Sequence, residues 1–270
     1  MPQEIKRDGA VINYHMSGQG DITLLFVHGS YIDQNYWSEQ VSFFSPHYTV
    51  VTIDLPGHGK SGRDRKNWSL EGFAEDVIEV IKTLHLENVI LIGHSIAGDV
   101  NLMAAVRYPE PIIGFIGVDN FKNAATPLPA QYQCQVSTIL ENLKKDFENT
   151  NEQYARMALL TSDAPSTVSN RVIRDYRNAY RPMGMATMPE VFEIYKMEKE
   201  LLPKLHVKLD LINVDYIPTN EEPLKQLTTH GFEVHHMEGA SHYPMIESPE
   251  EFNVLLEKEI HKIEREIHVY

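Results

Sequence analysis

The chain has 270 residues, of which 42% are hydrophobic and 23% are charged, as is typical of a globular protein with a large core. It carries 38 acidic and 24 basic residues, a net charge of −14, which disfavours nucleic acid and anionic membranes as partners. The single cysteine, Cys134, excludes an internal disulfide, and no segment has the roughly 18 apolar residues of a membrane span or the apolar core of a leader. We therefore expect a soluble, cytoplasmic protein without a membrane partner.

Apolar runs alternate with helical patterns along the first half of the chain. The alternating segment 10–16 predicts a half-buried strand. Near-continuous apolar runs predict strands buried on both faces at 22–27, 48–53, 88–93 and 112–118. Helices are predicted at 69–86 and 95–107. This alternation predicts the α/β class, with a mostly parallel, doubly wound sheet between two layers of helices.

The first predicted functional loop is "HGS" at 28–30, directly after the strand 22–27. Gly29 allows the backbone to approach a ligand closely, so the Ser30 N–H is a candidate donor to a developing oxyanion. His28 is either a catalytic base or a residue that hydrogen-bonds within this loop, and we favour the second interpretation.

The segment "DLPGHGKS" at 54–61 resembles a phosphate-binding loop of the pattern G-x-x-x-x-G-K-S. Asp54 stands where the first glycine is required, and the loop-like "GRDRKNWS" follows instead of a helix. We therefore predict no nucleotide binding.

The segment "GHSIA" at 93–97 follows a predicted strand and begins a predicted helix. Such a turn presents a serine nucleophile, here Ser95, and directs the Ile96 N–H towards an oxyanion. Small residues are needed two positions before and after the serine, and Gly93 and Ala97 both satisfy this requirement. The alternative is that Ser95 caps a buried helix.

The alternation stops near residue 120, where Asp119 ends the strand 112–118. Residues 122–204 have no strand pattern and form a predicted helical cap (lid) inserted into the core. The α/β core is therefore expected to comprise residues 1–121 and 205–270. The predicted cap helices are 129–147, 150–161, 167–179 and 189–201.

The final third contributes a candidate base and a second candidate acid. Strands are predicted at 207–213 and 232–237, with helices near 221–229 and from Pro249 onwards. His242 follows the last strand and is a candidate general base for Ser95, the alternative being a surface histidine. The acid that orients the base is either Asp119 or Asp215, because both end a strand and precede His242.

Four segments together resemble the α/β-hydrolase fold superfamily, in a serine-nucleophile form with a helical cap. They are "HGS" at 28–30, "DLPGHGKS" at 54–61, "GHSIAG" at 93–98 and "GASHYPMIESPEEF" at 239–252. The resemblance covers nearly the whole chain and implies that Ser95, His242 and an aspartate form a catalytic triad. It also implies an oxyanion hole made by the N–H groups of Ser30 and Ile96.

Two departures from the superfamily pattern refine this expectation. Haloalkane dehalogenases and epoxide hydrolases of the superfamily use an aspartate nucleophile, and dehalogenases place a tryptophan where this chain has Ile96, so those activities are disfavoured. Most relatives carry the acid after the seventh strand, where Asp215 fits only with a shifted register. A minority, such as zearalenone-hydrolase-like members, carry it after the sixth strand, which matches Asp119, and we favour Asp119.

The sequence thus predicts a carboxylesterase-like serine hydrolase that cleaves an ester or related acyl bond of a small, fairly apolar substrate. The alternatives are a carbon–carbon bond or lactone hydrolase, a cofactor-free perhydrolase, or a non-catalytic small-ligand receptor. Neither a metal nor an organic cofactor is expected, and a homodimer stays open. Tyrosines and methionines of the cap are candidate lining residues, namely Tyr176, Tyr180, Met183, Met185 and Met188.

Overall fold

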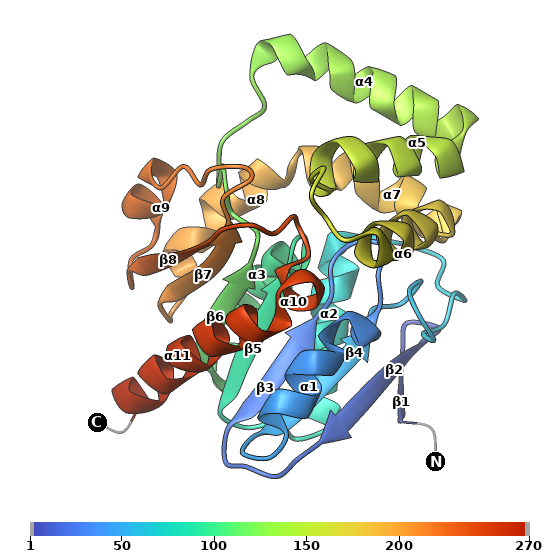
Figure 1. The fold of residues 1–270 in the computed structure, drawn as a ribbon. Helices are drawn as coiled ribbons and strands as arrows, with labels where there is room; N and C mark the ends of the chain where they lie inside the picture. Colours follow the sequence, from blue (N-terminus) through green and yellow to red (C-terminus); the bar gives the residue numbers. More distant parts are fainter. Residues whose placement is uncertain (1–2, 268–270) are drawn as a thin grey trace.

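The computed structural model describes residues 3–267 and contains one eight-stranded sheet between two layers of helices (Figure 1). The strands are β1 Glu4–Arg7, β2 Ala10–Ser17, β3 Thr23–Val27, β4 Thr49–Asp54, β5 Val89–His94, β6 Ile112–Val118, β7 Leu209–Val214 and β8 Phe232–Met237. The core helices are α1 Ser38–Phe44, α2 Leu70–Thr83, α3 Ala97–Arg107, α9 Glu222–Leu227, α10 Pro244–Glu247 and α11 Pro249–Ile267, with a short 3-10 helix, η1, at Gln34–Trp37.

The strand order across the sheet is β1-β2-β4-β3-β5-β6-β7-β8. β2 pairs antiparallel with both β1 and β4, whereas every pairing from β4 to β8 is parallel. This is the predicted mostly parallel α/β fold, and the carboxyl ends of its parallel strands meet at one edge.

The predicted apolar runs are strands of the sheet, and they are apolar because helices exclude water from both faces of the sheet. Figure 1 shows α1 and α11 on one face and α2 and α3 on the other. Every residue of β3, β4, β5 and β7 is accordingly buried. The helix α2 buries the predicted stripe of Phe73, Val77 and Ile81, and its cap Ser69 accepts the Gly72 N–H at 3.0 Å.

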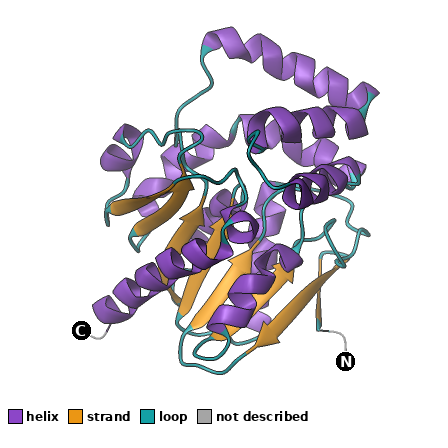
Figure 2. Ribbon diagram, viewed as in Figure 1, coloured by secondary structure: helices purple, strands orange, loops and turns teal. Residues whose placement is uncertain are grey.

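The segment 122–204 lies over the carboxyl edge of the sheet and contains helices and loops without a strand (Figure 2). Its helices are α4 Ala130–Lys145, α5 Phe147–Tyr154, α6 Ser166–Arg177, α7 Arg181–Phe192 and α8 Ile194–Leu201, with a π-helical turn, η2, at Ala155–Leu159 and a 3-10 turn, η3, at Leu202–Lys204. We refer to residues 122–204 as the cap. Residues 1–2 and 268–270, which the prediction assigned to the core, lie outside the described residues.

Two local features differ from the sequence-based expectations. β1 was not predicted, because only four residues are involved and only Ile5 is buried, opposite Ile12 of β2. The predicted helix 189–201 is instead the end of α7 followed by α8. Gly184 lies inside α7, where a Cβ would be 2.6 Å from the Phe147 ring, so glycine allows this close contact between α7 and α5.

Candidate active site

Ser95 lies on a sharp turn between β5 and α3. Its φ is +55°, in the left-handed region that non-glycine residues rarely adopt, and its N–H donates to Val118 O at 3.0 Å. A Cβ on Gly93 would lie 2.6 Å from Ala97 O, so the strand and helix backbones nearly touch. Ala97 is fully buried and its methyl group fits this space. The turn has the geometry that presents a nucleophile.

The "HGS" loop lies directly against this turn. A Cβ on Gly29 would be 3.0 Å from Ser95 Cβ and 2.6 Å from His94 Nδ1, so glycine is needed for the close approach. Ser30 and Ile96 both line the cavity next to Ser95. Among residues 3–267, no hydrogen bond uses the N–H group of Ser30 or Ile96. Both groups are therefore available to an anionic oxygen at this point.

His242 lies in the loop between β8 and α10 and is almost completely buried. Its Nδ1 lies 2.6 Å from Asp119 Oδ2. Its backbone is held from two sides: the His242 N–H donates to Leu159 O of the cap at 3.0 Å, and His94 Nε2 donates to His242 O at 2.7 Å. The ring centroids of His94 and His242 are 4.6 Å apart, so the imidazole lies beside the turn that carries Ser95.

Asp119 follows β6 and is 3% exposed. Its Oδ1 accepts the Val214 N–H at 2.9 Å and contacts Lys122 Nζ at 2.7 Å, which leaves Oδ2 to His242. Burial alone would raise the pKa of Asp119, but the hydrogen bonds and positive charges of His242 and Lys122 outweigh it and lower the pKa. A carboxylate held ionised in this way can fix the orientation and tautomer of an imidazole.

Asp215, the alternative acid, lies beyond the end of β7 and is considerably more exposed than Asp119. Its Oδ1 contacts His236 Nδ1 at 2.8 Å, and its N–H donates to Met237 O at 3.0 Å. The structure therefore brings Asp119, and not Asp215, to His242.

Two neighbours of these residues were not singled out from the sequence. Asn120 Nδ2 donates to Gly93 O at 2.9 Å and to Ser95 O at 3.2 Å, so it supports the turn from below. His94 is fully buried, and burial lowers its pKa well below the ordinary value, as does the neighbouring His242. It therefore stays neutral and donates to the His242 carbonyl. Each is adjacent in sequence to a candidate site residue, but only the fold shows what it supports.

A cavity of about 200 Å³ opens beside Ser95, between the core loops and the cap. The cap contributes Tyr154, Leu159, Tyr176, Met188, Val191 and Ile194. Of the residues expected to line it, Tyr176 and Met188 do so, whereas Tyr180 packs against the Trp68 ring and the Arg63 guanidinium. The volume is below the range of about 300–1,000 Å³ of drug-sized pockets, so it suits a small molecule.

The cavity wall also contains Asp99, in the first turn of α3. Asp99 is 6% exposed and its carboxyl hydrogen-bonds that of Glu198 on α8, itself 5% exposed. Glu198 Oε2 accepts the Ala125 N–H at 2.6 Å. Burial raises the pKa of Asp99 well above its ordinary value, and so does Glu198. Two carboxyl groups in contact require a proton between them.

His28, the other histidine considered, is engaged within its own loop. Its Nε2 accepts the Leu55 N–H at 3.0 Å and its Nδ1 donates to Gly29 O at 2.7 Å. Burial lowers its pKa, although nearby Asp54 opposes this shift. His28 is therefore placed to hold the "HGS" loop in position.

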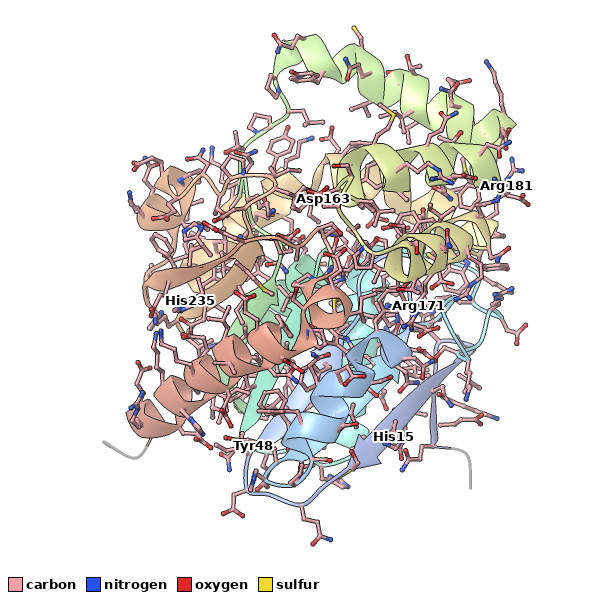
Figure 3. All side chains as sticks on the ribbon, in the orientation of Figure 1. His15, Tyr48, Asp163, Arg171, Arg181 and His235 are labelled. Atoms are coloured by element: carbon pink, nitrogen blue, oxygen red, sulfur yellow. The ribbon has the colours of Figure 1, made fainter. Side chains whose placement is uncertain are left out.

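One group of possible metal ligands lies away from the cavity, where Glu233, His235 and Glu259 approach one another. His235 lies on β8 and contacts Glu259 of α11 at 2.9 Å, and Figure 3 labels it at the left of the molecule. Lys262 Nζ already contacts Glu233 at 2.6 Å and Glu259 at 3.1 Å, so a lysine occupies the place a cation would take. No described helix is long and apolar enough to cross a membrane.

Comparisons with known proteins concern the family and the fold of the chain. A family model described as "Alpha/beta hydrolase family" matches residues 24–254. The "(E)-2-((N-methylformamido)methylene)succinate hydrolase" of Acinetobacter baylyi is 35% identical over 180 residues, 65% of this chain and 68% of that protein. The "Karrikin insensitive 2 receptor CA" of Petunia hybrida is 22% identical, over 92% of this chain and 95% of that protein.

Among solved structures, a thermophilic esterase from Thermogutta terrifontis superposes with a TM-score of 0.80 at 19% sequence identity. The superposition covers 97% of this chain and 99% of that chain. At this identity the similarity concerns the fold alone.

Proposed function

Because the chain belongs to the alpha/beta hydrolase family, we propose that it hydrolyses an ester or related acyl bond of a small, fairly apolar molecule, with Ser95 as the nucleophile. The observation that carries the proposal is the buried 2.6 Å contact between Asp119 and His242, beside a serine in a left-handed turn at a cavity. The name of the Acinetobacter relative supports hydrolysis in general and does not identify the substrate of this chain.

In the proposed mechanism, His242 takes the proton of Ser95 Oγ through Nε2 while its Nδ1–H donates to Asp119. Ser95 attacks the carbonyl carbon, and the oxyanion is bound by the N–H groups of Ser30 and Ile96. His242 returns the proton to the leaving group, and an acyl-enzyme forms. Water then transfers a proton to His242 and attacks the acyl carbon, and His242 returns this proton to Ser95 Oγ as the acid is released. Each of these steps uses groups of the chain and water.

The test is the hydrolysis of short-chain 4-nitrophenyl esters by the wild type and by Ser95→Ala. We expect a loss in kcat of about 10³-fold or more, because the covalent route is removed. Ser137→Ala, at an exposed position of α4, is the matched control and should keep wild-type turnover. Equal turnover by Ser95→Ala and the wild type would reject Ser95 as the nucleophile.

The same three residues also suit hydrolysis of a lactone or a carbon–carbon bond, and perhydrolysis without a cofactor. The substrate panel therefore includes a γ-lactone, a β-diketone, and an ester with hydrogen peroxide as the acyl acceptor. Comparison of kcat/KM across this panel identifies the preferred bond, since all of these reactions depend on Ser95 but differ in what the cavity must hold.

A small-ligand receptor is the second candidate, because the Petunia receptor is similar over nearly the full length of both chains. Intact-mass measurement after reaction with a fluorophosphonate distinguishes the two functions. A single adduct on Ser95 supports the hydrolase, whereas an unmodified protein without turnover supports a receptor.

A further inference from the structure

The cavity beside Ser95 has an unusual distribution of charge. Its lining residues include two acidic side chains, Asp99 and Asp119, and no lysine, arginine or histidine among the residues described. Asp119 is balanced by Lys122 and His242. For Asp99 the neighbouring ionisable group is another acid, Glu198.

The Asp99–Glu198 pair has no cationic partner in the described part of the chain. The ion pairs formed there include neither residue, and no donor reaches Asp99 Oδ1. Glu198 receives one N–H group, from Ala125. With one proton shared, the pair carries about one negative charge at a site where burial makes an unbalanced charge costly.

Much of the remaining wall near the pair is apolar, with Ile96, Phe121 and Ile194 among its residues. An apolar wall weakens dielectric screening and so strengthens the attraction between the pair and a cation inside the cavity. Asp99 lies one helical turn after Ser95, so a short substrate can reach both residues. The net charge of −14 also favours the approach of cations.

We propose that Asp99, paired with Glu198, is a specificity-determining residue of the candidate active site and binds an ammonium or other N–H-bearing group of the substrate. This inference rests on the proposed function for its role in catalysis. The inference goes beyond the proposed function because it names the substrate class. This class comprises small acyl compounds with a cationic or hydrogen-bond-donating group a few atoms from the scissile carbonyl. Substrates with a carboxylate at that place are disfavoured.

The kinetic experiment uses three thioacetates with the same acyl group. Their thiols end in dimethylammonium, isopropyl or carboxylate, as in S-[2-(dimethylamino)ethyl] thioacetate, S-(3-methylbutyl) thioacetate and 3-(acetylthio)propanoate. The first two have nearly the same shape and differ in charge and in one N–H donor. The measurement is kcat/KM at about pH 7.5, where an alkylamine is protonated. Intrinsic differences in reactivity cancel when each variant is compared with the wild type.

We expect Asp99→Asn to lower the ratio of kcat/KM for the ammonium over the isopropyl compound by about tenfold or more, as for the loss of a charge-assisted hydrogen bond. The carboxylate compound should gain relative to the isopropyl compound. Glu190→Gln is the matched control, because Glu190, like Glu198, is a cap carboxylate that accepts a backbone N–H, here from Leu70 at 2.9 Å, but it does not line the cavity. An unchanged ratio in Asp99→Asn would overturn the proposal.

A binding experiment separates this inference from the proposed function. Calorimetry measures the affinity of the wild type for N-[2-(dimethylamino)ethyl]acetamide and N-(3-methylbutyl)acetamide, which are amide analogues of the first two thioesters. The wild type should bind the ammonium compound about tenfold more tightly, and Asp99→Asn should bind both equally. If no thioester is turned over, the proposed function fails, but this preference still supports the inference.

A second variant covers the case in which Asp99→Asn does not fold. Asp99→Ala removes the carboxyl group that lines the cavity without adding an amide, and it should abolish the same preference. Equal affinity of the wild type for the two amides would overturn the proposal without any variant.

Discussion

Asp119 and Asp215 show how two chemically identical residues at strand ends come to differ. Both follow parallel strands of one sheet edge, and both contact a histidine. His236, the partner of Asp215, is about half exposed, whereas His242, the partner of Asp119, is nearly buried. Asp119 in addition accepts a hydrogen bond from the Val214 N–H and forms an ion pair with Lys122. A buried and fully hydrogen-bonded carboxylate holds an imidazole in one orientation, while an exposed one is screened by water.

At the residue scale we predict a large difference between Asp119→Asn and Asp215→Asn. Asp119→Asn should lower kcat for ester hydrolysis by about 10⁴-fold, as the corresponding change does in serine proteases, because the wrong tautomer of His242 is stabilised. Asp215→Asn should stay within about twofold, since its carboxylate contacts an exposed histidine. Steady-state kinetics on one ester with both purified variants checks the prediction, and a larger loss for Asp215→Asn would assign the acid to Asp215.

At the element scale, α3 and α8 connect the candidate nucleophile to the cap. α3 begins next to Ser95 and carries Asp99, and α8 carries Glu198. The cap also contacts the catalytic loop through the hydrogen bond from the His242 N–H to Leu159 O. Leu159 ends a π-helical turn, a feature that is frequent at functional sites. The cap thus contacts the region of Ser95 through α8 and α3, and the backbone of His242 through Leu159.

The Asp99–Glu198 pair makes stability depend on pH. Burial and the neighbouring Glu198 raise the pKa of Asp99, so the folded state keeps a proton that the unfolded chain releases near the ordinary carboxyl pKa. Its contribution to stability is fully present below that ordinary pKa and is lost as the pH rises through the raised value. In Asp99→Asn this carboxyl group is absent, so its pH-dependent contribution to stability is absent too.

We therefore expect the Tm of Asp99→Asn, relative to the wild type, to increase as the pH is raised from about 4.5 to 8. Thermal unfolding of both proteins across this range is the measurement. Glu87→Gln, at an exposed loop position, serves as the control and should follow the wild type at every pH. A Tm difference that is constant, or that declines with pH, would contradict the proton-sharing pair.

At the scale of the whole molecule, one buried ion cluster joins the edge of the sheet to the helical layer. Asp76 of α2 is fully buried and accepts hydrogen bonds from Arg7 at 2.8 Å and from Arg65 at 2.6 and 2.7 Å. Arg65 is 4% exposed, and Arg7 ends β1. This cluster fixes the edge strand β1, the loop after β4 and α2 to one another.

Asp76→Ala should lower the free energy of unfolding by about 3–5 kcal/mol, because it leaves the buried Arg65 without its carboxylate. Urea denaturation measures this loss. Glu75→Ala is the matched control: Glu75 is the neighbouring residue of α2 and pairs with Arg107 at the surface, a contact of about 0–1 kcal/mol. Similar losses in the two variants would show that burial does not strengthen the Asp76 cluster.

Much of the fold was predictable because its signals are local. Seven of the eight strands were predicted, and four of them follow from near-continuous apolar runs at 22–27, 48–53, 88–93 and 112–118, since a strand buried on both faces must be apolar at nearly every position. The turn at Ser95 was predictable from Gly93 and Ala97, because close backbone contact admits only small side chains there. β1 and the division between α7 and α8 could not be predicted, because they depend on pairing and packing with segments that are distant in the sequence.

The sequence by itself determined the α/β class, the position of the helical cap segment and the set of candidate residues Ser95, His242, Asp119 and Asp215. These follow from the periodicity of burial and from the residues that strand ends present. Only the tertiary structure decided that Asp119 contacts His242. The same is true of the hydrogen bonds from Asn120 to the turn at Ser95 and from His94 to the His242 carbonyl. It is also true of the contact between Asp99 and Glu198, which are 99 residues apart in the sequence. Such contacts depend on strand order and on how the cap lies over the sheet, and neither is encoded in any local stretch of sequence.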